Sequence, residues 1–195
     1  MTNEGRNTSK LHQDTLYGAV VASYGLHSTL VADSDTVEYR KHGDKRFGMV
    51  ANDLLFGEGP HAYQADVVVN GKRISDEHGY LLMTMVSNLE KAFTISPDSK
   101  PLDGQMWLIH FGALSGKEAM DVMGSAYNGG KHVLREEVRY ENVTVVKVLI
   151  REEGDWKWRR VCIDGAVVAI DEGGWFEVSV VESEREVMCV IVDRD

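Results

Sequence analysis

The chain has 195 residues, of which 43% are apolar and 27% are charged, so it resembles neither a disordered nor a collagen-like sequence. Its 21 basic and 31 acidic residues give a formal net charge of −10. This balance argues against DNA or RNA as the main partner, because clustered Lys and Arg hold phosphate backbones, and no apolar run approaches the roughly 20 residues that cross a bilayer.

The N-terminal region is predicted to contain a linker followed by a strand. Residues 1–14 are polar and show no apolar period, which indicates a flexible tail or linker, and residues 15–195 are expected to form one domain. The dense apolar run Tyr17–Tyr24 predicts a buried strand, and Leu30–Ala32 is expected to continue that sheet.

The next segment of the sequence, residues 36–56, has the residue spacing of helices. Apolar residues recur with charges between them from 36 to 56, which predicts a short helix and a longer one separated at Gly43. Asp35 is the expected N-cap, and Gly57–Pro60 ends the helical stretch.

The rest of the chain is mainly β in its pattern. Asn70-Gly71 and Asp164-Gly165 are two-residue hairpin turns, and a single helix is expected over Gly116–Met123. Many short strands with glycine turns predict a mainly β, α+β fold, an antiparallel sandwich or barrel with a small helical insert near the N-terminus. The predicted strands are Ala62–Asn70, Tyr80–Ser87, Gln105–Phe111, Val138–Ile150, Trp156–Ile163, Val167–Ile170, Trp175–Val181 and Val187–Val192.

The sequence contains no self-sufficient active-site motif. It has no phosphate-binding glycine loop, no dinucleotide-binding glycine motif and no nucleophile elbow. Its seven histidines do not pair with each other or with cysteine at metal-ligand spacing, so no metal site is expected. The two cysteines, Cys162 and Cys189, lie in predicted strands and favour a reducing, cytoplasmic location.

Two local clusters have both a structural and a functional interpretation. Asp33 and Asp35 fit a helix cap and turn, or a polar anchor at the mouth of an apolar pocket. The basic stretch Tyr39–Arg46 fits a solvated helix face, or a phosphate-contacting patch, since arginine matches phosphate oxygens well. Asp164-Gly165 alone indicates a hairpin turn.

Three stretches, read together and in order, carry a family resemblance. They are Ser23-Tyr-Gly-Leu-His-Ser-Thr-Leu-Val-Ala-Asp-Ser-Asp35 with Glu38-Tyr-Arg40, Gly43 and Lys45-Arg-Phe47; then Asp103-Gly-Gln-Met-Trp-Leu-Ile109 after Pro97; then Val161-Cys-Ile-Asp-Gly165. They resemble the C-terminal domain of the sphingosine kinase and diacylglycerol kinase family of lipid kinases over about residues 17–182. The sphingosine kinase branch is the most similar.

The resemblance implies one half of a two-lobed enzyme. In this family an N-terminal lobe holds ATP and Mg²⁺ and supplies the general base, whereas the C-terminal β-sandwich holds the lipid. The chain would then be the lipid-substrate-binding lobe, catalytically incomplete on its own. It would have no catalytic residue, and neither ATP nor Mg²⁺ is expected to bind to it alone.

Residue roles also follow from the resemblance. Asp35 matches the carboxylate that engages the lipid head group, and pairs with the amine in sphingoid-specific members. Leu30, Val31 and Phe47 match residues that line the lipid-tail pocket. Arg40 and Arg46 match basic residues that reach the nucleotide phosphates, and Asp164 is a weaker match for that site. Family members usually follow the late Asp-Gly pair with an acidic residue, and Ala166 replaces it here.

Several partners and two competing functions are consistent with this reading. The expected partners are a sphingoid base or diacylglycerol-like lipid, the N-terminal kinase lobe and, transiently, a membrane surface contacted from the cytoplasm. A dimer through an unpaired sheet edge is a further expectation. The alternatives are a stand-alone module that binds lipids or apolar ligands without catalysis, and a structural interaction domain without a pocket.

Overall fold

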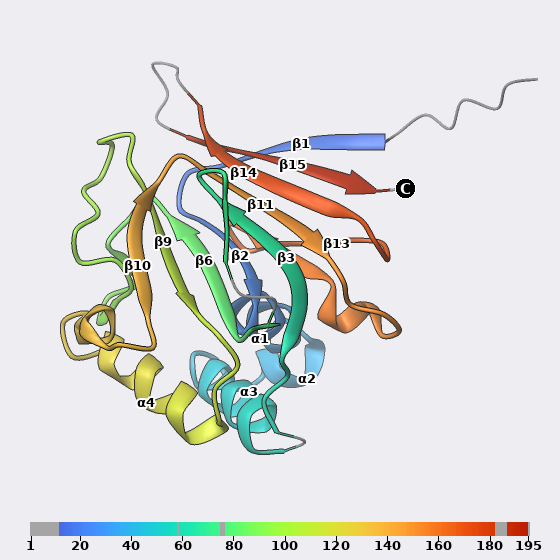
Figure 1. Cartoon of the computed structure of the whole chain (residues 1–195). Helices are drawn as coiled ribbons and strands as arrows, with labels where there is room; N and C mark the ends of the chain where they lie inside the picture. The colour runs from blue at the N-terminus through green and yellow to red at the C-terminus, as the bar shows by residue number, and fades with distance from the viewer. Residues whose placement is uncertain (1–11, 58, 75–76, 182–186, 195) are drawn as a thin grey trace, which may run out of the picture.

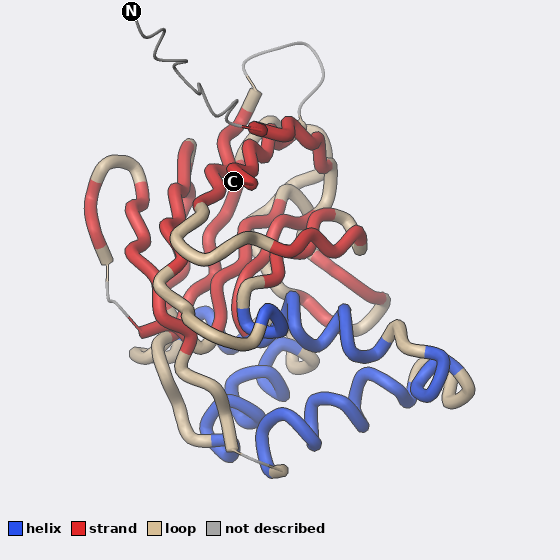
Figure 2. Tube along the Cα trace, turned by 90° about the vertical axis from the view of Figure 1, so that its right-hand side faces the viewer, coloured by secondary structure: helices blue, strands red, loops and turns tan. Residues whose placement is uncertain are grey.

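Two antiparallel sheets stack face to face in the computed structural model, which describes residues 12–57, 59–74, 77–181 and 187–194. The helices gather at one end of the strands (Figures 1 and 2). In spatial order the first sheet consists of β1 (His12–Gly18), β15 (Met188–Arg194), β14 (Trp175–Val180), β11 (Val145–Ile150), β3 (Tyr63–Val69) and β4 (Lys72–Arg73), and β5 (Glu77–His78) also pairs with β3.

The second sheet lies between the first sheet and helix α4 (Gly116–Ala126). Its strands, in spatial order, are β10 (Arg139–Val143), β9 (Met106–Phe111), β6 (Tyr80–Thr84), β2 (Val21–Gly25), β12 (Arg160–Ile163) and β13 (Ala166–Ala169). A small hairpin of β7 (Asn88–Glu90) and β8 (Phe93–Thr94) and the short helix η1 (Lys131–Leu134) complete this side. The predicted antiparallel β-sandwich with a helical insert is therefore confirmed.

The second sheet is buried on both faces, and this gives the domain two cores. Along β6, Leu81 and Met83 face the first sheet, whereas Tyr80 and Leu82 face α4. Burial on both sides explains why this strand is continuously apolar instead of alternating with polar residues.

The predicted strand Tyr17–Tyr24 is two strands in different sheets. Residues 12–18 form β1, which pairs with β15, so the strand begins inside the segment assigned to a tail. The chain then crosses to β2 in the second sheet. Asp164 stabilises the crossing, because its carboxylate accepts hydrogen bonds from the N–H groups of Ala19, Val20 and Val21 at 2.7–3.0 Å. The apolar run is thus divided between two sheets, and its local sequence pattern gives no sign of this division.

The predicted strand Val138–Ile150 is divided in the same way. Its first part is β10 of the second sheet and its second part is β11 of the first. Asn70, in the β3–β4 turn, accepts hydrogen bonds at the crossing from Thr144 N, Thr144 Oγ1 and Val145 N at 3.0–3.1 Å. Asn70 and Asp164 both adopt a positive φ, of 48° and 47°, as their hairpin turns require.

Residues 30–32, expected to continue a sheet, lie in helix α1 (Leu26–Ser34). Gly25 turns the chain out of β2 with a φ of 87°, and Ser28 Oγ donates to Gly25 O at 2.9 Å in the first turn. Both edges of β2 are already occupied by β6 and β12. The prediction was wrong because the three apolar residues pack as a helix against the strand ends, a tertiary preference that outweighs local propensity.

The two helices separated at Gly43 are confirmed as α2 (Val37–Arg40) and α3 (Lys45–Phe56). Asp35 is not their N-cap. It is the C-cap of α1, and Thr36 caps α2 instead, because its Oγ1 accepts from Tyr39 N at 3.4 Å.

Two other boundaries differ from the prediction. The segment predicted as a strand over Trp156–Ile163 begins with the 3₁₀ helix η2 (Trp156–Trp158), capped by Asp155 through the N–H of Lys157, and only then enters β12. The predicted helix Gly116–Met123 is α4, which extends to Ala126 and starts with a capping box between Ser115 and Glu118.

Candidate functional site

Asp35, Arg40 and Arg46 lie together where α1, α2 and α3 succeed one another. Arg40 donates from Nε to Asp35 Oδ1 at 2.8 Å and from Nη2 to Asp35 Oδ2 at 2.6 Å, with both side chains more than half exposed. The Arg40 hydrogen bond lowers the pKa of Asp35, and the positive charge of Arg46 lowers it further. The structure thus assembles the three charged residues to which the sequence analysis assigned head-group and phosphate contacts.

Leu30, Val31 and Phe47 lie on the same helices without surrounding a cavity. Leu30 and Val31 are half-buried on α1. Phe47 is 36% exposed in the first turn of α3, where the Arg46 guanidinium lies 4.7 Å from the ring centroid. None of the three lines the apolar cavity that the described residues form.

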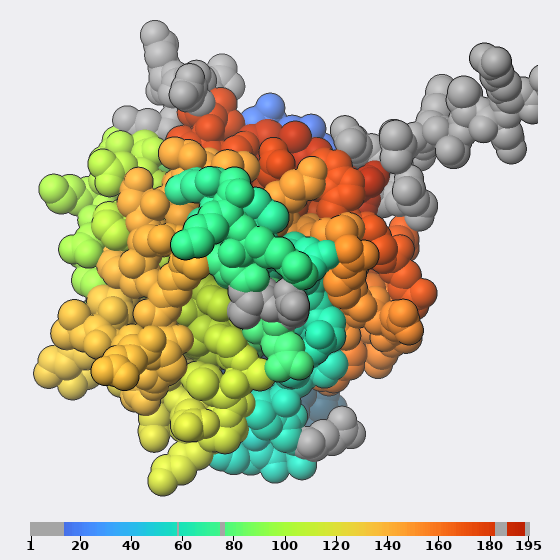
Figure 3. All heavy atoms as spheres, viewed as in Figure 1, coloured from blue at the N-terminus to red at the C-terminus, as the bar shows by residue number. Residues whose placement is uncertain are grey.

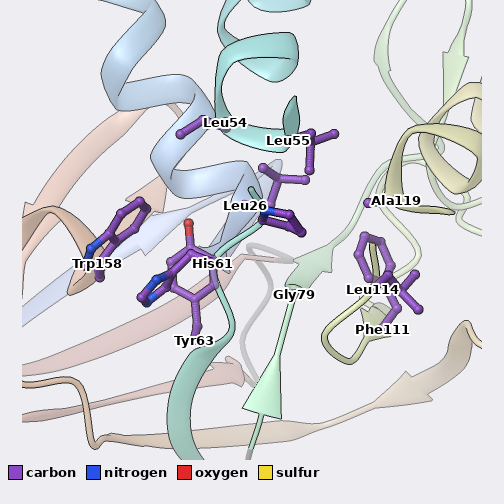
Figure 4. A pocket seen from close by; sticks show the side chains of 11 residues that line it. Leu26, Leu54, Leu55, His61, Tyr63, Gly79, Phe111, Leu114, Ala119 and Trp158 are labelled. Atoms are coloured by element: carbon purple, nitrogen blue, oxygen red, sulfur yellow. The ribbon is translucent and has the colours of Figure 1, made fainter. Parts of the chain in front are cut away.

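That cavity lies where α1, α3 and α4 meet the ends of the sheets (Figure 4). Trp158, His61 and Tyr63 stand on one side of it, and Phe111 and Leu114 stand on the other. Its volume is about 20 Å³, which is room for about one water molecule and far too little for a lipid chain. The other lining residues are Leu26, Leu54, Leu55, Pro60, Gly79 and Ala119.

Close contact between α3 and α4 forms one side of the cavity. A Cβ atom placed on Gly116 would lie 2.2 Å from Leu55 O, so only glycine permits this approach of the two helices. Figure 3 shows atoms of the C-terminal part of α3 and of α4 lying against each other. A ligand larger than the cavity would need its walls to move apart.

One wall of the cavity has a polar layer behind it. Tyr63 Oη donates to Thr29 Oγ1 of α1 at 2.8 Å, and burial raises the Tyr63 pKa. The ring of Tyr24 lies 5.4 Å from that of Tyr63, and its buried hydroxyl has no hydrogen-bond partner among the described residues. Burial, followed by the negative charge of Glu152, raises the pKa of Tyr24.

His61 links this wall to a buried carboxylate. Its ring stacks on Trp158 at 4.1 Å with an interplanar angle of 7°, and its Nε2 lies 2.9 Å from Glu152 Oε1. The same Glu152 oxygen accepts from Gln64 N at 2.7 Å. Sequence analysis missed this group because its members come from loops and strands far apart in the chain.

Asp33 is a second carboxylate on α1, and it is engaged much more tightly than Asp35. The guanidinium of Arg160, which is 6% exposed, donates to Asp33 Oδ1 at 2.8 Å, and Lys157 Nζ lies 3.5 Å from Asp33 Oδ2. This pair ties α1 to η2 and β12. The Val31–Asp35 spacing indicated two carboxylates, but not which one was the less exposed.

Asp164 lies at the opposite end of β2 from α1. Strand β2 runs from Val21, which Asp164 contacts, to Gly25, after which α1 begins. Both carboxylate oxygens already accept from backbone N–H groups, so Asp164 has a structural role in the described chain. Ala166 follows in β13 and carries no ionisable group.

The described residues form no cluster of three or more His, Cys, Asp or Glu side chains that could hold a metal ion. None of the described helices combines the length and apolar character that a bilayer crossing requires.

Comparisons with known proteins identify the fold. No family model matches the sequence, and no curated protein matches it. A crystal structure of a "putative diacylglycerol kinase" from Bacillus anthracis str. Sterne is similar with a TM-score of 0.54 and 12% identity, covering 93% of this chain and 54% of that one. A second structure of a protein described in the same words, from the same source, has a TM-score of 0.53 and 11% identity with the same coverage.

The chain therefore spans about half the length of these proteins and shares the fold of that half. The resemblance to lipid kinases noted from the sequence is confirmed at the level of the fold.

Proposed function

We propose that this chain is the lipid-substrate-binding lobe of a lipid kinase that transfers a phosphoryl group from ATP to a lipid hydroxyl. The proposal rests on one observation: the helices at one end of a lipid-kinase-like β-sandwich carry both an apolar cavity and the Asp35–Arg40–Arg46 cluster. The sequence has no phosphate-binding glycine loop, so ATP and Mg²⁺ would be held by a separate N-terminal lobe.

The helical end gives each part of a lipid a place to bind. An ionised carboxylate has about four acceptor positions, so Asp35 can accept from a ligand while it keeps both hydrogen bonds to Arg40. We assign Asp35 to the head group and Arg40 and Arg46 to nucleotide phosphates reached across the lobe interface. The acyl chain would enter alongside Leu30, Val31 and Phe47 and extend into the cavity once α3 moves away from α4.

We expect transient contact with a membrane from the cytoplasm, because the proposed substrate is a lipid that resides in a bilayer. The helices α2 and α3 expose Val37, Met49 and Phe56 by 80%, 39% and 51%, which favours transient contact with a lipid surface. The net charge of −10 gives no general attraction to anionic lipid, so contact would depend on these apolar side chains.

Binding of lipids to the purified chain tests the proposal. Tryptophan fluorescence, with Trp158 at the cavity wall, would be followed during titration with sphingosine, a short-chain ceramide and a short-chain diacylglycerol. We expect saturable binding, and Asp35→Asn should weaken the amine-bearing lipid by more than about tenfold while changing the neutral lipids little. Asp121→Asn, an exposed carboxylate on α4, is the matched control.

Three results would count against parts of this proposal. Equal losses for amine-bearing and neutral lipids would remove the amine-anchor role of Asp35. A wild-type chain that binds no long-chain lipid would remove the lipid-binding function itself. Robust ATP turnover by the chain alone would contradict the requirement for a second lobe.

One observation favours a second function, a lipid or apolar-ligand binding module without catalysis. Ala166 provides no acidic group after Asp164-Gly165, and Asp164 is occupied by backbone N–H groups. If a full-length form that contains the nucleotide lobe binds lipid and ATP but transfers no phosphate, this second function is the correct one.

A further inference from the structure

The second sheet ends at β13, whose outer edge presents backbone groups without partners in the sheet. Across the two-residue turn of the β12–β13 hairpin, Ile163 faces Ala166. A turn of this length makes its flanking residues a hydrogen-bonded pair, and bonded pairs then alternate with non-bonded pairs along the ladder. Val167 and Ala169 occupy non-bonded positions, so their N–H and C=O groups point away from β12.

This edge lacks the features that usually prevent strands from pairing between molecules. Val167 is 39% exposed, Ala169 is also exposed, and no hydrogen bond to their backbone groups is found among the described residues outside the hairpin. At the opposite edge of the same sheet, β10 carries Arg139 and Glu141, which form an ion pair at 2.8 Å. Charges and prolines protect edge strands, and β13 (Ala166–Ala169) has neither.

The alternation of bonded and non-bonded positions in the hairpin allows the outer edge of β13 to pair with the same edge of a second copy. If two copies lie antiparallel about a two-fold axis at Val168, Val167 of each copy faces Ala169 of the other. Every outward N–H and C=O of these residues then has a partner. An axis at Val167 or at Ala169 leaves part of these groups unpaired within the strand. We infer that β13 pairs with β13 of a second copy in the Val168-centred register, so that the two second sheets become continuous.

Salt should strengthen this pairing. Each copy carries a net charge of −10, so the two copies repel each other, whereas the edges that meet carry no charge. Raising the salt from about 0.1 M to about 1 M shortens the screening length from about 10 Å to about 3 Å and weakens that repulsion.

The first experiment measures mass by sedimentation equilibrium over a concentration series at both salt levels. We expect the wild-type mass to rise from 21.8 kDa toward twice that value, and to rise further at high salt. Ala169→Pro removes an outward donor without breaking a bond to β12, and Val167→Lys adds a charge, so both should abolish the rise. Leu134→Lys, at a residue that is 81% exposed elsewhere, should not. A monomeric wild-type chain, or a dimer unaffected by both edge variants, overturns the inference.

A second experiment tests the register by cysteine cross-linking in a background that carries both Cys162→Ser and Cys189→Ser, because Cys162 faces position 167 across the hairpin. In the inferred register the two Val168 residues form a close non-bonded pair, whose Cα separation of about 4.5 Å suits a disulfide. Val168→Cys should therefore form a covalent dimer under mild oxidation, whereas Val167→Cys, displaced from its own copy, should not. Efficient cross-linking by Val167→Cys and not by Val168→Cys would refute this register.

Discussion

Replacing Asp33 with alanine tests how α1 is held against the sandwich. The variant removes the carboxylate that accepts from Arg160 at 2.8 Å and leaves that guanidinium, 6% exposed, with a hydrogen bond from its Nε to Lys157 O. The comparison is Asp35→Ala, which removes a carboxylate from an ion pair whose two side chains are both more than half exposed.

The expected loss for Asp33→Ala is about 2–3 kcal/mol. Breaking a buried ion pair from one side costs roughly 3–5 kcal/mol because a buried charge is left alone, and the 24% exposure of Asp33 reduces that figure. Asp35→Ala should leave the free energy of unfolding unchanged within error, because solvent screens an exposed pair. Asp33→Asn, which keeps a neutral acceptor for Arg160, should fall between the two.

Urea denaturation followed by circular dichroism supplies the measurement, with the midpoint and slope fitted for each variant. Asp33→Ala in an Arg160→Met background should cost much less than in the wild type, because no buried charge is then left unpaired. Equal stability losses for Asp33→Ala and Asp35→Ala would show that the pair with Arg160 does not hold α1, and would refute the reasoning.

Two further predictions concern pH and packing. Burial lowers the pKa of His27 to about 4 and that of His110 to about 3, so on acidification below about 6.5 the unfolded chain takes up protons that the folded chain does not. Stability should fall between pH 7 and 5 by up to about 1.4 kcal/mol per pH unit for each histidine, and an unchanged slope in His110→Asn would contradict this. Gly116→Ala should cost about 1–3 kcal/mol because its Cβ would overlap Leu55 O, whereas Gly124→Ala on the same helix meets open space and should be neutral or stabilising. Thermal unfolding compares the two alanine variants, and equal midpoints would contradict close α3–α4 contact.

Much of the strand content could be predicted because it depends on local pattern. The strand predicted over Gln105–Phe111 is β9, and that over Trp175–Val181 is β14, each within one residue at either end. The crossings at residues 19–20 and at Thr144 could not be predicted, because apolar residues continue through them and only the pairing partners change. Helix α1 was missed because its nine residues have little amphipathic character.

In the candidate site, too, the features that are local in the sequence could be predicted and those assembled by tertiary structure could not. Asp35, Arg40 and Arg46 are close in sequence and on consecutive helices, so their proximity could be foreseen. The cavity could not, because its walls come from segments as distant as Leu26, Phe111 and Trp158. Asp164 looked like a ligand contact only through its motif, and its actual partners, residues 19–21, lie more than 140 positions away in the chain.

The hydrogen bonds that Asn70 and Asp164 accept from the two inter-sheet connections have a consequence for how the domain unfolds. Each side chain sits in a hairpin turn of one sheet and holds the stretch of chain that passes from one sheet to the other. Neither sheet should unfold while the other stays folded, because disordering one of these turns also releases the connection that it holds between the two sheets. The two sheets are thus linked at two points without any covalent bond, and the domain should unfold in one cooperative transition.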